Sequence, residues 1–268
     1  MERNNLKDKI QDVLIYEGTD YNDVPIRIYD SGQAYQSASF LSEEDKYELV
    51  FEYMKQFNRA IELKPDASSI LLLGGAGYAY PKYVLSHYPR IKIDVVEIDP
   101  MAIETARQFF FLDDCFNEFG QDSFTNIVDD AKNYLENNTK QYDIIINDAF
   151  VELEPVFDLL TIQAITTAKQ SLNKDGIYVF NLPGYKKLET TEYIKDVTKT
   201  LEQVFKYVLI FRAFNYKYLR SGNYIVLARD KYDQMHDMLE LDNSQGIIIT
   251  KDSIQEAKKK FYEFVNYW

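Results

Sequence analysis

Apolar runs of strand length alternate with helical segments from Ser69 onward, and this alternation constrains the fold of the 268-residue chain more than any other feature. Strict alternation of strand and helix is typical of a mostly parallel sheet with right-handed crossovers. The expected strands are Ile70 to Leu73, Ile91 to Ile98, Phe124 to Val128, Tyr142 to Ile146 and Gly176 to Phe180. The sequence therefore predicts an α/β fold with a doubly wound, mostly parallel sheet, and ligand sites at the carboxyl ends of its strands.

The segment before this core predicts a small N-terminal β appendage. Short β-rich runs lie between residues 11 and 39, and they are separated by turn-forming residues. Ser42 and the acids after it are typical of a helix N-terminus, and we expect that helix to continue to about residue 62. We therefore divide the chain into the appendage with its linking helix, residues 1–62, and a Rossmann-like nucleoside-binding domain, residues 63–268.

The segment after the core extends the sheet. A helix is expected at about residues 189–203, and the apolar runs 207–211 and 224–228 follow it. These two runs predict an antiparallel hairpin at the sheet edge. A further helical pattern near residues 252–265 completes the predicted order of elements.

Composition and charge disfavour several classes of function. The net charge of −13 and the lack of a Lys/Arg cluster argue against a nucleic-acid partner. Neither a membrane-length apolar run nor a hydrophobic signal region is present, so we expect a cytoplasmic protein without a membrane partner. Cys115 is the only cysteine, and His87 and His236 lie far apart, so we expect no metal site and no histidine-based hydrolase triad.

A glycine-rich loop follows the first core strand directly. Gly74, Gly75 and Gly77, with Ala76 between the last two, let the backbone turn sharply and approach a ligand closely. Reading from Gly75, the third small residue of a dinucleotide fingerprint is replaced by Tyr80, which makes NAD the weaker ligand. The loop predicts a nucleotide or nucleoside site, with a tight turn that binds nothing as the alternative.

An acid ends the second core strand, at Glu97, twenty residues after Gly77. That spacing is typical of the carboxylate that meets ribose hydroxyls in a Rossmann fold, and such a carboxylate would repel a 2′-phosphate. Pro100 then suits the start of a helix. Together with the loop, Glu97 predicts a nucleoside site and disfavours NADP.

Acids also follow the third and fourth core strands. Asp130 and Ala131 begin a helix, where the carboxylate could accept a hydrogen bond from an adenine amino group or serve only as a helix cap. Asp148 ends the fourth strand, beside the expected position of the reactive carbon of a bound nucleoside. We take Asp148 as the candidate catalytic carboxylate.

These elements, in this order, resemble the spermidine synthase family of aminopropyltransferases over about residues 12 to 230. The segments that carry the resemblance are Gly32-Gln33-Ala34-Tyr35-Gln36-Ser37, Tyr47-Glu48, Leu73-Gly74-Gly75-Ala76-Gly77, Val96-Glu97-Ile98-Asp99 and Ser221 to Ala228. The resemblance implies a methyltransferase-type Rossmann fold and a homodimer. It also implies a role in polyamine biosynthesis, with decarboxylated S-adenosylmethionine as donor and a small amine, such as a polyamine, as acceptor.

The same resemblance assigns residues to the site. It makes Gln36, Glu97, Asp130 and Asp148 the contacts to the nucleoside or the transferred group, and it makes Tyr47 a candidate substrate contact. We expect the glycine loop and Ala131 to bind the donor as well.

The chain departs from the family pattern at two positions. The acid of the family's Gly-Gly-Gly-Asp-Gly loop falls on Gly77, and the base of its Asp-Ser-Ser-Asp motif falls on Val151. Glu152 and Glu154 follow Val151 closely and are candidates for the amine site, or they belong to an exposed acidic loop. A missing base costs about 10² to 10⁴ in rate.

Three alternatives therefore stay open beside aminopropyl transfer. The chain could be an S-adenosylmethionine-dependent methyltransferase, since the same donor fold serves both reactions. It could be a catalytically silent nucleoside-binding or assembly protein, because two signature acids are missing. An NAD-dependent oxidoreductase shares the Glu97 argument but not the loop.

Overall fold

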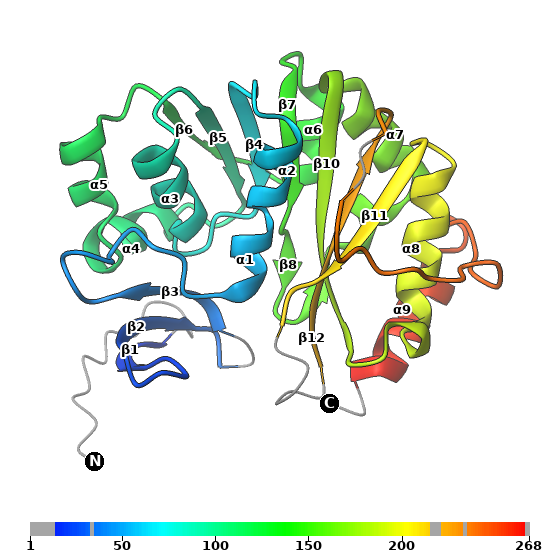
Figure 1. Cartoon of the computed structure of the whole chain (residues 1–268), viewed down its shortest axis with the longest axis horizontal. Coiled ribbons are helices and arrows are strands. Elements are labelled where there is room, and N and C mark those ends of the chain that lie inside the picture. Colours follow the sequence, from blue (N-terminus) through cyan, green and yellow to red (C-terminus); the bar gives the residue numbers. More distant parts are fainter. Residues whose placement is uncertain (1–13, 33–34, 215–220, 233–234, 266–268) are drawn as a thin grey trace.

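A twisted seven-stranded sheet forms the centre of the molecule (Figure 1). The computed structural model describes residues 14–32, 35–214, 221–232 and 235–265. The strand order is β11-β12-β10-β7-β4-β5-β6, in which the five strands from β10 to β6 pair in parallel and β12 pairs antiparallel with both of its neighbours. The strands are β4 Ser69–Leu73, β5 Lys92–Glu97, β6 Phe124–Val128, β7 Tyr142–Asn147, β10 Leu172–Tyr185, β11 Tyr207–Arg212 and β12 Ser221–Arg229. The predicted doubly wound sheet and its antiparallel edge hairpin are confirmed.

Helices cover both faces of this sheet because the central strands are apolar on both sides. Ile70 and Leu72 belong to one buried cluster, and Leu71 and Leu73 belong to the other. The first face carries α1 Glu52–Gln56, α2 Asn58–Leu63, α3 Ala79–His87, α4 Ala102–Phe109 and α5 Leu112–Phe119, and the second carries α6 Ala131–Asn137, α7 Ile162–Gln170, α8 Glu192–Glu202 and α9 Ile254–Val265. Two short 3₁₀ helices, Phe157–Leu160 and Leu188–Thr190, and a two-stranded hairpin of β8 Phe150–Val151 with β9 Glu154–Pro155 complete the elements. The sequence did not predict this hairpin.

The N-terminal appendage is a three-stranded antiparallel sheet that docks on the first face. Its strands are β1 Leu14–Thr19, β2 Pro25–Asp30 and β3 Tyr35–Phe40, in the order β1-β2-β3. Lys82 of α3 donates hydrogen bonds to Ser39 Oγ of β3 (2.7 Å) and to the carbonyl oxygen of Phe110. Lys82 is buried, and burial lowers the pKa of its amine to about 7. Hydrogen bonds from a buried amine to neutral partners thus join the appendage to α3, which covers the first face of the central sheet. Gln33 and Ala34, which carry part of the family resemblance, lie outside the described residues.

The helix expected from Ser42 begins later than predicted, at Glu52. Ser42 Oγ does accept a hydrogen bond from the backbone N–H of Asp45 (3.1 Å), but this caps a turn and not a helix. Lys46 and Tyr47 of the same segment contact α5, through Asp114 (3.4 Å) and Glu118 (3.1 Å). These tertiary contacts favour an irregular segment over the helix that the local sequence indicates.

Candidate active site

The glycine loop after β4 packs against the backbone at the end of β7. Gly74 has φ +96°, and a Cβ atom there would lie 2.4 Å from the carbonyl oxygen of Asp148. The backbone N–H of Asp148 in turn donates to the carbonyl oxygen of Leu73 (2.9 Å). Only glycine tolerates both that conformation and that approach. The loop and Asp148 are therefore held together by their backbones.

Glu97 fixes the shape of the same loop from the other side. Its Oε2 accepts hydrogen bonds from the backbone N–H groups of Gly75 (2.7 Å) and Ala76 (3.0 Å), and its Oε1 accepts one from Asp99 (2.9 Å). The side chain is half-buried at the end of β5. An ionised carboxylate offers about four acceptor positions, so capacity remains for the hydroxyls of a sugar.

The ends of β5 and β6 add an acid and an apolar surface beside Glu97. Asp130 is exposed and caps α6, whose first residue is Ala131, by accepting a hydrogen bond from the backbone N–H of Asn133 (2.9 Å). Two large apolar residues at these strand ends are exposed to solvent, with exposed fractions of 68% for Ile98 and 53% for Val128. Exposed apolar side chains next to a polar cradle suit a flat aromatic base. Sequence reasoning missed this pair, although both residues flank the predicted acids.

Asp148 follows β7 directly and is half-buried. Its Oδ1 accepts a hydrogen bond from the side-chain amide of Asn181 (2.7 Å), and the hydroxyl of Tyr53 also donates to the carboxylate. Burial raises the pKa of Asp148 to about 7, against the opposing effect of these two hydrogen bonds. A carboxylate with such a pKa can accept a proton near neutral pH.

The β8–β9 hairpin carries the acids near Val151. Val151 is 67% exposed, and Glu152 lies at the tip with φ 58°. Glu154 bonds to α9, through Lys258 (2.8 Å) and the hydroxyl of Tyr262. Of the two glutamates, Glu154 thus has its carboxylate engaged by the C-terminal helix, whereas Glu152 is exposed.

The remaining predicted residues lie in the appendage and the segment after it. Gln36 donates its side-chain amide to Ser31 Oγ (3.2 Å), while its neighbour Ser37 lies against Gly77. A Cβ atom at Gly77 would lie 2.7 Å from Ser37 Oγ, so the hydroxyl occupies the space that a side chain at position 77 would need. The hydroxyl of Tyr47 bonds to Glu118 of α5, and its ring packs on Phe119 at 5.4 Å.

The structure thus gathers most of the predicted site at one edge of the sheet. Gly74, Gly75, Glu97 and Asp148 share direct contacts, and Gly77 belongs to the same loop. Asp130 and Ala131 follow the strand next to Glu97. Tyr53 and Asn181 complete the surroundings of Asp148 and were not predicted. A polar residue straight after the apolar run 176–180 was the signal for Asn181.

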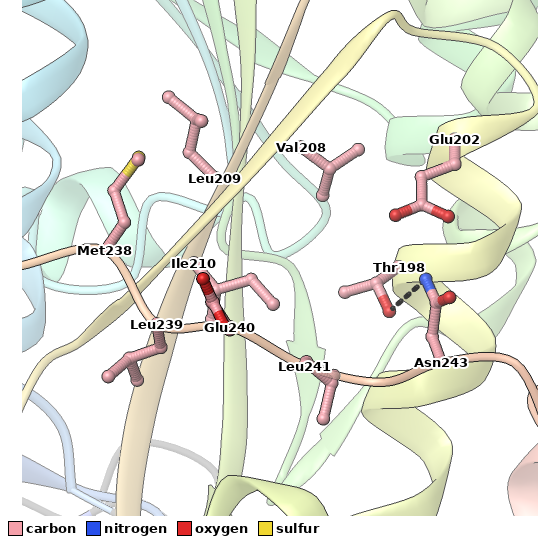
Figure 2. A pocket seen from close by; sticks show the side chains of 10 residues that line it. All are labelled: Thr198, Glu202, Val208, Leu209, Ile210, Met238, Leu239, Glu240, Leu241 and Asn243. Carbon is pink, nitrogen blue, oxygen red and sulfur yellow. Dashed lines mark hydrogen bonds between the residues drawn. The ribbon is translucent and has the colours of Figure 1, made fainter. Parts of the chain in front are cut away.

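A separate cavity lies away from these residues. It has a volume of about 360 Å³ and lies between α8, β11 and the segment 238–243 (Figure 2). Thr198 and Glu202 of α8 face it, and Asn243 bonds to Thr198 Oγ1 (3.3 Å) across it. None of the predicted site residues lines it.

The described ranges contain neither a cluster of metal ligands nor a helix suited to cross a membrane. No group of three or more His, Cys, Asp or Glu side chains there could hold a metal ion. In the same part of the chain, no helix combines the length and the apolar character that a membrane crossing requires.

The family model and the curated relatives that match this chain agree with each other. A family model described as the spermine/spermidine synthase domain matches residues 52–243. A polyamine aminopropyltransferase of Vibrio vulnificus is 25% identical over 267 residues, which cover 97% of this chain and 80% of that protein.

Solved structures share the fold. A probable spermidine synthase from Corynebacterium glutamicum has a TM-score of 0.69 at 22% identity, with 86% of this chain and 81% of that chain covered. A spermidine synthase in complex with the transition-state analogue AdoDATO has a TM-score of 0.58 at 17% identity, covering 93% and 88%. Human methyltransferase-like protein 13 in complex with SAH has a TM-score of 0.54 at 20% identity, covering 78% and 91%. The sheet is therefore of the methyltransferase type, as predicted.

Proposed function

The chain belongs to the spermine/spermidine synthase family, and from that premise we propose that it transfers an aminopropyl group from decarboxylated S-adenosylmethionine to an amine acceptor. The observation that carries the proposal is Asp148, a half-buried carboxylate whose backbone contacts the glycine loop and whose pKa is about 7. It combines a charge that attracts an amine with the ability to accept a proton at neutral pH.

The nucleoside donor fits the residues around the loop. Glu97 retains acceptor capacity for ribose hydroxyls, Asp130 is exposed beside it, and Ile98 and Val128 offer an apolar surface for the base. The donor supplies an electrophilic carbon next to its sulfonium sulfur. These contacts would hold the nucleoside in place, and positioning is the main catalytic device of such a displacement.

Asp148 would act on the acceptor amine. Its carboxylate would orient the amine towards the electrophilic carbon, where a nitrogen–carbon bond forms as the carbon–sulfur bond breaks and its electron pair stays on sulfur. The nitrogen then carries one proton in excess, which passes to Asp148. The second acidic position of the family's Asp-Ser-Ser-Asp motif is Val151 in this chain, so of the two motif positions only Asp148 can accept the proton.

The proposal is tested by offering the purified protein decarboxylated S-adenosylmethionine with a panel of diamines and polyamines and detecting products by mass spectrometry. We expect an aminopropylated amine together with the thioether nucleoside. Glu97→Gln should weaken nucleoside binding in calorimetry by removing a charge that the loop and the ribose share. Asp122→Asn, an exposed acid outside the site, is the matched control. Absence of product with every acceptor would refute the proposal.

Methyl transfer from S-adenosylmethionine is a second candidate, and Gly77 favours it. An acid at this loop position would repel the carboxylate of the intact donor, but the chain has no charge there and Ser37 fills the space. Tighter binding of S-adenosylmethionine than of its decarboxylated form, with methylated products, would select this reaction.

The predicted homodimer and the predicted cytoplasmic location also stay proposals, supported by family membership. Light scattering of the purified protein tests the dimer, and a monomer at micromolar concentration would contradict it.

A further inference from the structure

Two asparagine side chains form a hydrogen-bonded chain that ends on Asp148. Asn223 of β12 donates its side-chain amide to Asn181 Oδ1 of β10 (2.7 Å), and Asn181 donates its own amide to Asp148 Oδ1 (2.7 Å). Asn181 is only 4% exposed, so both ends of its amide are used inside the protein. The chain crosses three strands, β12, β10 and β7, at the edge of the sheet that carries the glycine loop.

The direction of this chain is fixed by the ionised Asp148 carboxylate, which can only accept hydrogen bonds. An asparagine side chain can rotate so that its oxygen and its nitrogen exchange places, and the rotated form of Asn181 would present an oxygen to the Asp148 carboxylate. In that form the amide of Asn223 would face another N–H group and lose its acceptor. Two facing oxygens repel each other, so Asn181 keeps its donating end on Asp148, and the amide of the half-buried Asn223 then donates to the remaining oxygen of Asn181.

Apart from the hydrogen-bonded asparagines, few groups in the described ranges are recorded against the Asp148 carboxylate. Tyr53 of α1 is the one titratable residue recorded against Asp148 within the described ranges, and its hydroxyl donates to the carboxylate. The other elements packed there contribute neutral groups, the Gly74 backbone and the Asn181 amide. Because no cation is recorded beside Asp148 in these ranges, the neutral donors are what stabilises its charged form against burial.

We propose that Asn181 and Asn223 are positioning residues of the transferase reaction. Asn181 binds Asp148 Oδ1 and Asn223 holds Asn181, so that the ionised carboxylate presents its remaining acceptor positions to the acceptor amine. This inference rests on the proposed function for the role of Asp148. It also makes a claim about the charge of Asp148 that can be measured without any substrate. Asn181 belongs to none of the segments that carry the family resemblance, and Asn223 lies in the segment Ser221 to Ala228, to which the sequence assigned no role in the site.

The test compares Asn181→Leu and Asn223→Leu with the control Asn173→Leu. Asn173 donates an equivalent bond (3.0 Å) to Asp143, at the other end of the same strand. The pKa of Asp148 is measured by NMR on ¹³C-labelled carboxylates, and the pH profile of kcat is measured in parallel. We expect Asn181→Leu to raise the pKa of Asp148 by about one unit, Asn223→Leu to raise it by less, and Asn173→Leu to leave it unchanged.

The kinetic profile should follow the titration. Protonated Asp148 cannot accept a proton, so the acidic limb of the kcat profile should move to higher pH in Asn181→Leu, with a loss of about five-fold at pH 7 that shrinks at pH 9. A merely structural role would lower the rate at all pH values without moving this limb. An unchanged pKa of Asp148 in folded Asn181→Leu overturns the inference.

Two further outcomes separate the inference from the proposed function. If the pKa moves in NMR but the rate profile does not, the positioning contact stands and the role of Asp148 in transfer fails. If Asn181→Leu does not fold, Asn223→Leu decides, since it leaves Asn181 in place, and an unchanged pKa in that variant overturns the inference.

Discussion

The two ends of strand β7 carry the same type of residue in opposite states. Asp143 lies near its beginning and is surrounded by donors, from Ser68 (N 2.8 Å, Oγ 3.0 Å), Ser69 (3.2 Å) and Asn173 (3.0 Å), with Lys64 at 3.7 Å. Burial alone would raise the pKa of Asp143, but these hydrogen bonds and Lys64 hold it below its usual value. Asp148, directly after the end of the strand, has two recorded side-chain donors, and burial prevails.

This contrast separates a structural carboxylate from a reactive one. A carboxylate with a full set of donors is a structural anchor, because its charged form is already satisfied. A carboxylate with few donors is kept reactive, and it lowers the stability of the fold in which it lies. The strand positions both groups, but only the end beside the glycine loop leaves acceptor capacity for a ligand.

Asp148→Asn should give the largest effect on activity. The amide can still accept the hydrogen bond from Asn181, but it cannot take a proton, so kcat should fall by about 10² to 10⁴. Steady-state kinetics of aminopropyl transfer measure this. A rate within two- or three-fold of the wild type, about the scatter of such assays, would remove Asp148 from the chemistry and end the contrast with Asp143.

Asp143→Ala should give the largest loss of stability. Several part-buried donors would lose their charged acceptor, so the free energy of unfolding should fall by about 2 kcal/mol, as measured by urea denaturation at pH 7. Because the folded pKa of Asp143 lies below the unfolded one, its contribution is present above about pH 4 and is lost as pH falls through the folded value. The wild type and the variant should therefore converge in acid. An equal deficit at all pH values would mean that packing, not charge, is lost.

Asp148→Asn should stabilise the fold while it removes activity. The folded pKa of Asp148, about 7, lies above the unfolded value of about 3.9, so the folded state prefers the protonated form. Its contribution to stability is therefore present below about pH 4 and is lost as pH rises through 7. The full pKa difference corresponds to about 4 kcal/mol, and because Asp148 is only half-buried we expect the variant to gain on the order of 2 kcal/mol over the wild type at pH 8, with little gain at pH 4. A loss of stability at pH 8 would mean that the charged form of Asp148 stabilises the fold, as that of Asp143 does.

Lys82→Met extends the comparison to a buried cation. Lys82 resembles Asp148, because its recorded hydrogen bonds go to neutral oxygens and burial dominates its pKa. The unfolded chain holds this proton up to about pH 10.4, whereas the folded state releases it above about 7, so stability should rise with pH between these values. The variant should lack this rise, which amounts to about 1 kcal/mol between pH 7 and 8. If the stability of both proteins changes with pH in the same way across that range, the lowered pKa of Lys82 is contradicted.

The sequence was sufficient for the central sheet because each core strand is a short apolar run with its own turn signals. It also predicted that Glu97 and Asp148 lie at strand ends, where a parallel sheet binds ligands, and in the structure Glu97 is the last residue of β5 and Asp148 directly follows β7. The family resemblance was confirmed by the match to residues 52–243. These predictions depend on local patterns and on topology, which a single sequence contains.

Contacts between distant segments could not be predicted in the same way. The segment from Ser42 has helix signals but is held in turns by α5, and Glu154 is bound by α9 more than a hundred residues away. The surroundings of Asp148 depend on the pairing of β10 with β12, which sets Asn223 opposite Pro183 and so brings its side chain diagonally onto Asn181. No local rule specifies such pairs, because they depend on register.

The three backbone bonds that Glu97 accepts have a consequence for the rate and the thermodynamics of ligand capture. The loop is already in one conformation before a nucleoside arrives, since Gly75, Ala76 and Asp99 share one carboxylate. A preorganised site spares the ligand the entropy cost of ordering a loop. Association should then be a single fast step, without the slow rearrangement that follows encounter when a loop closes over its ligand.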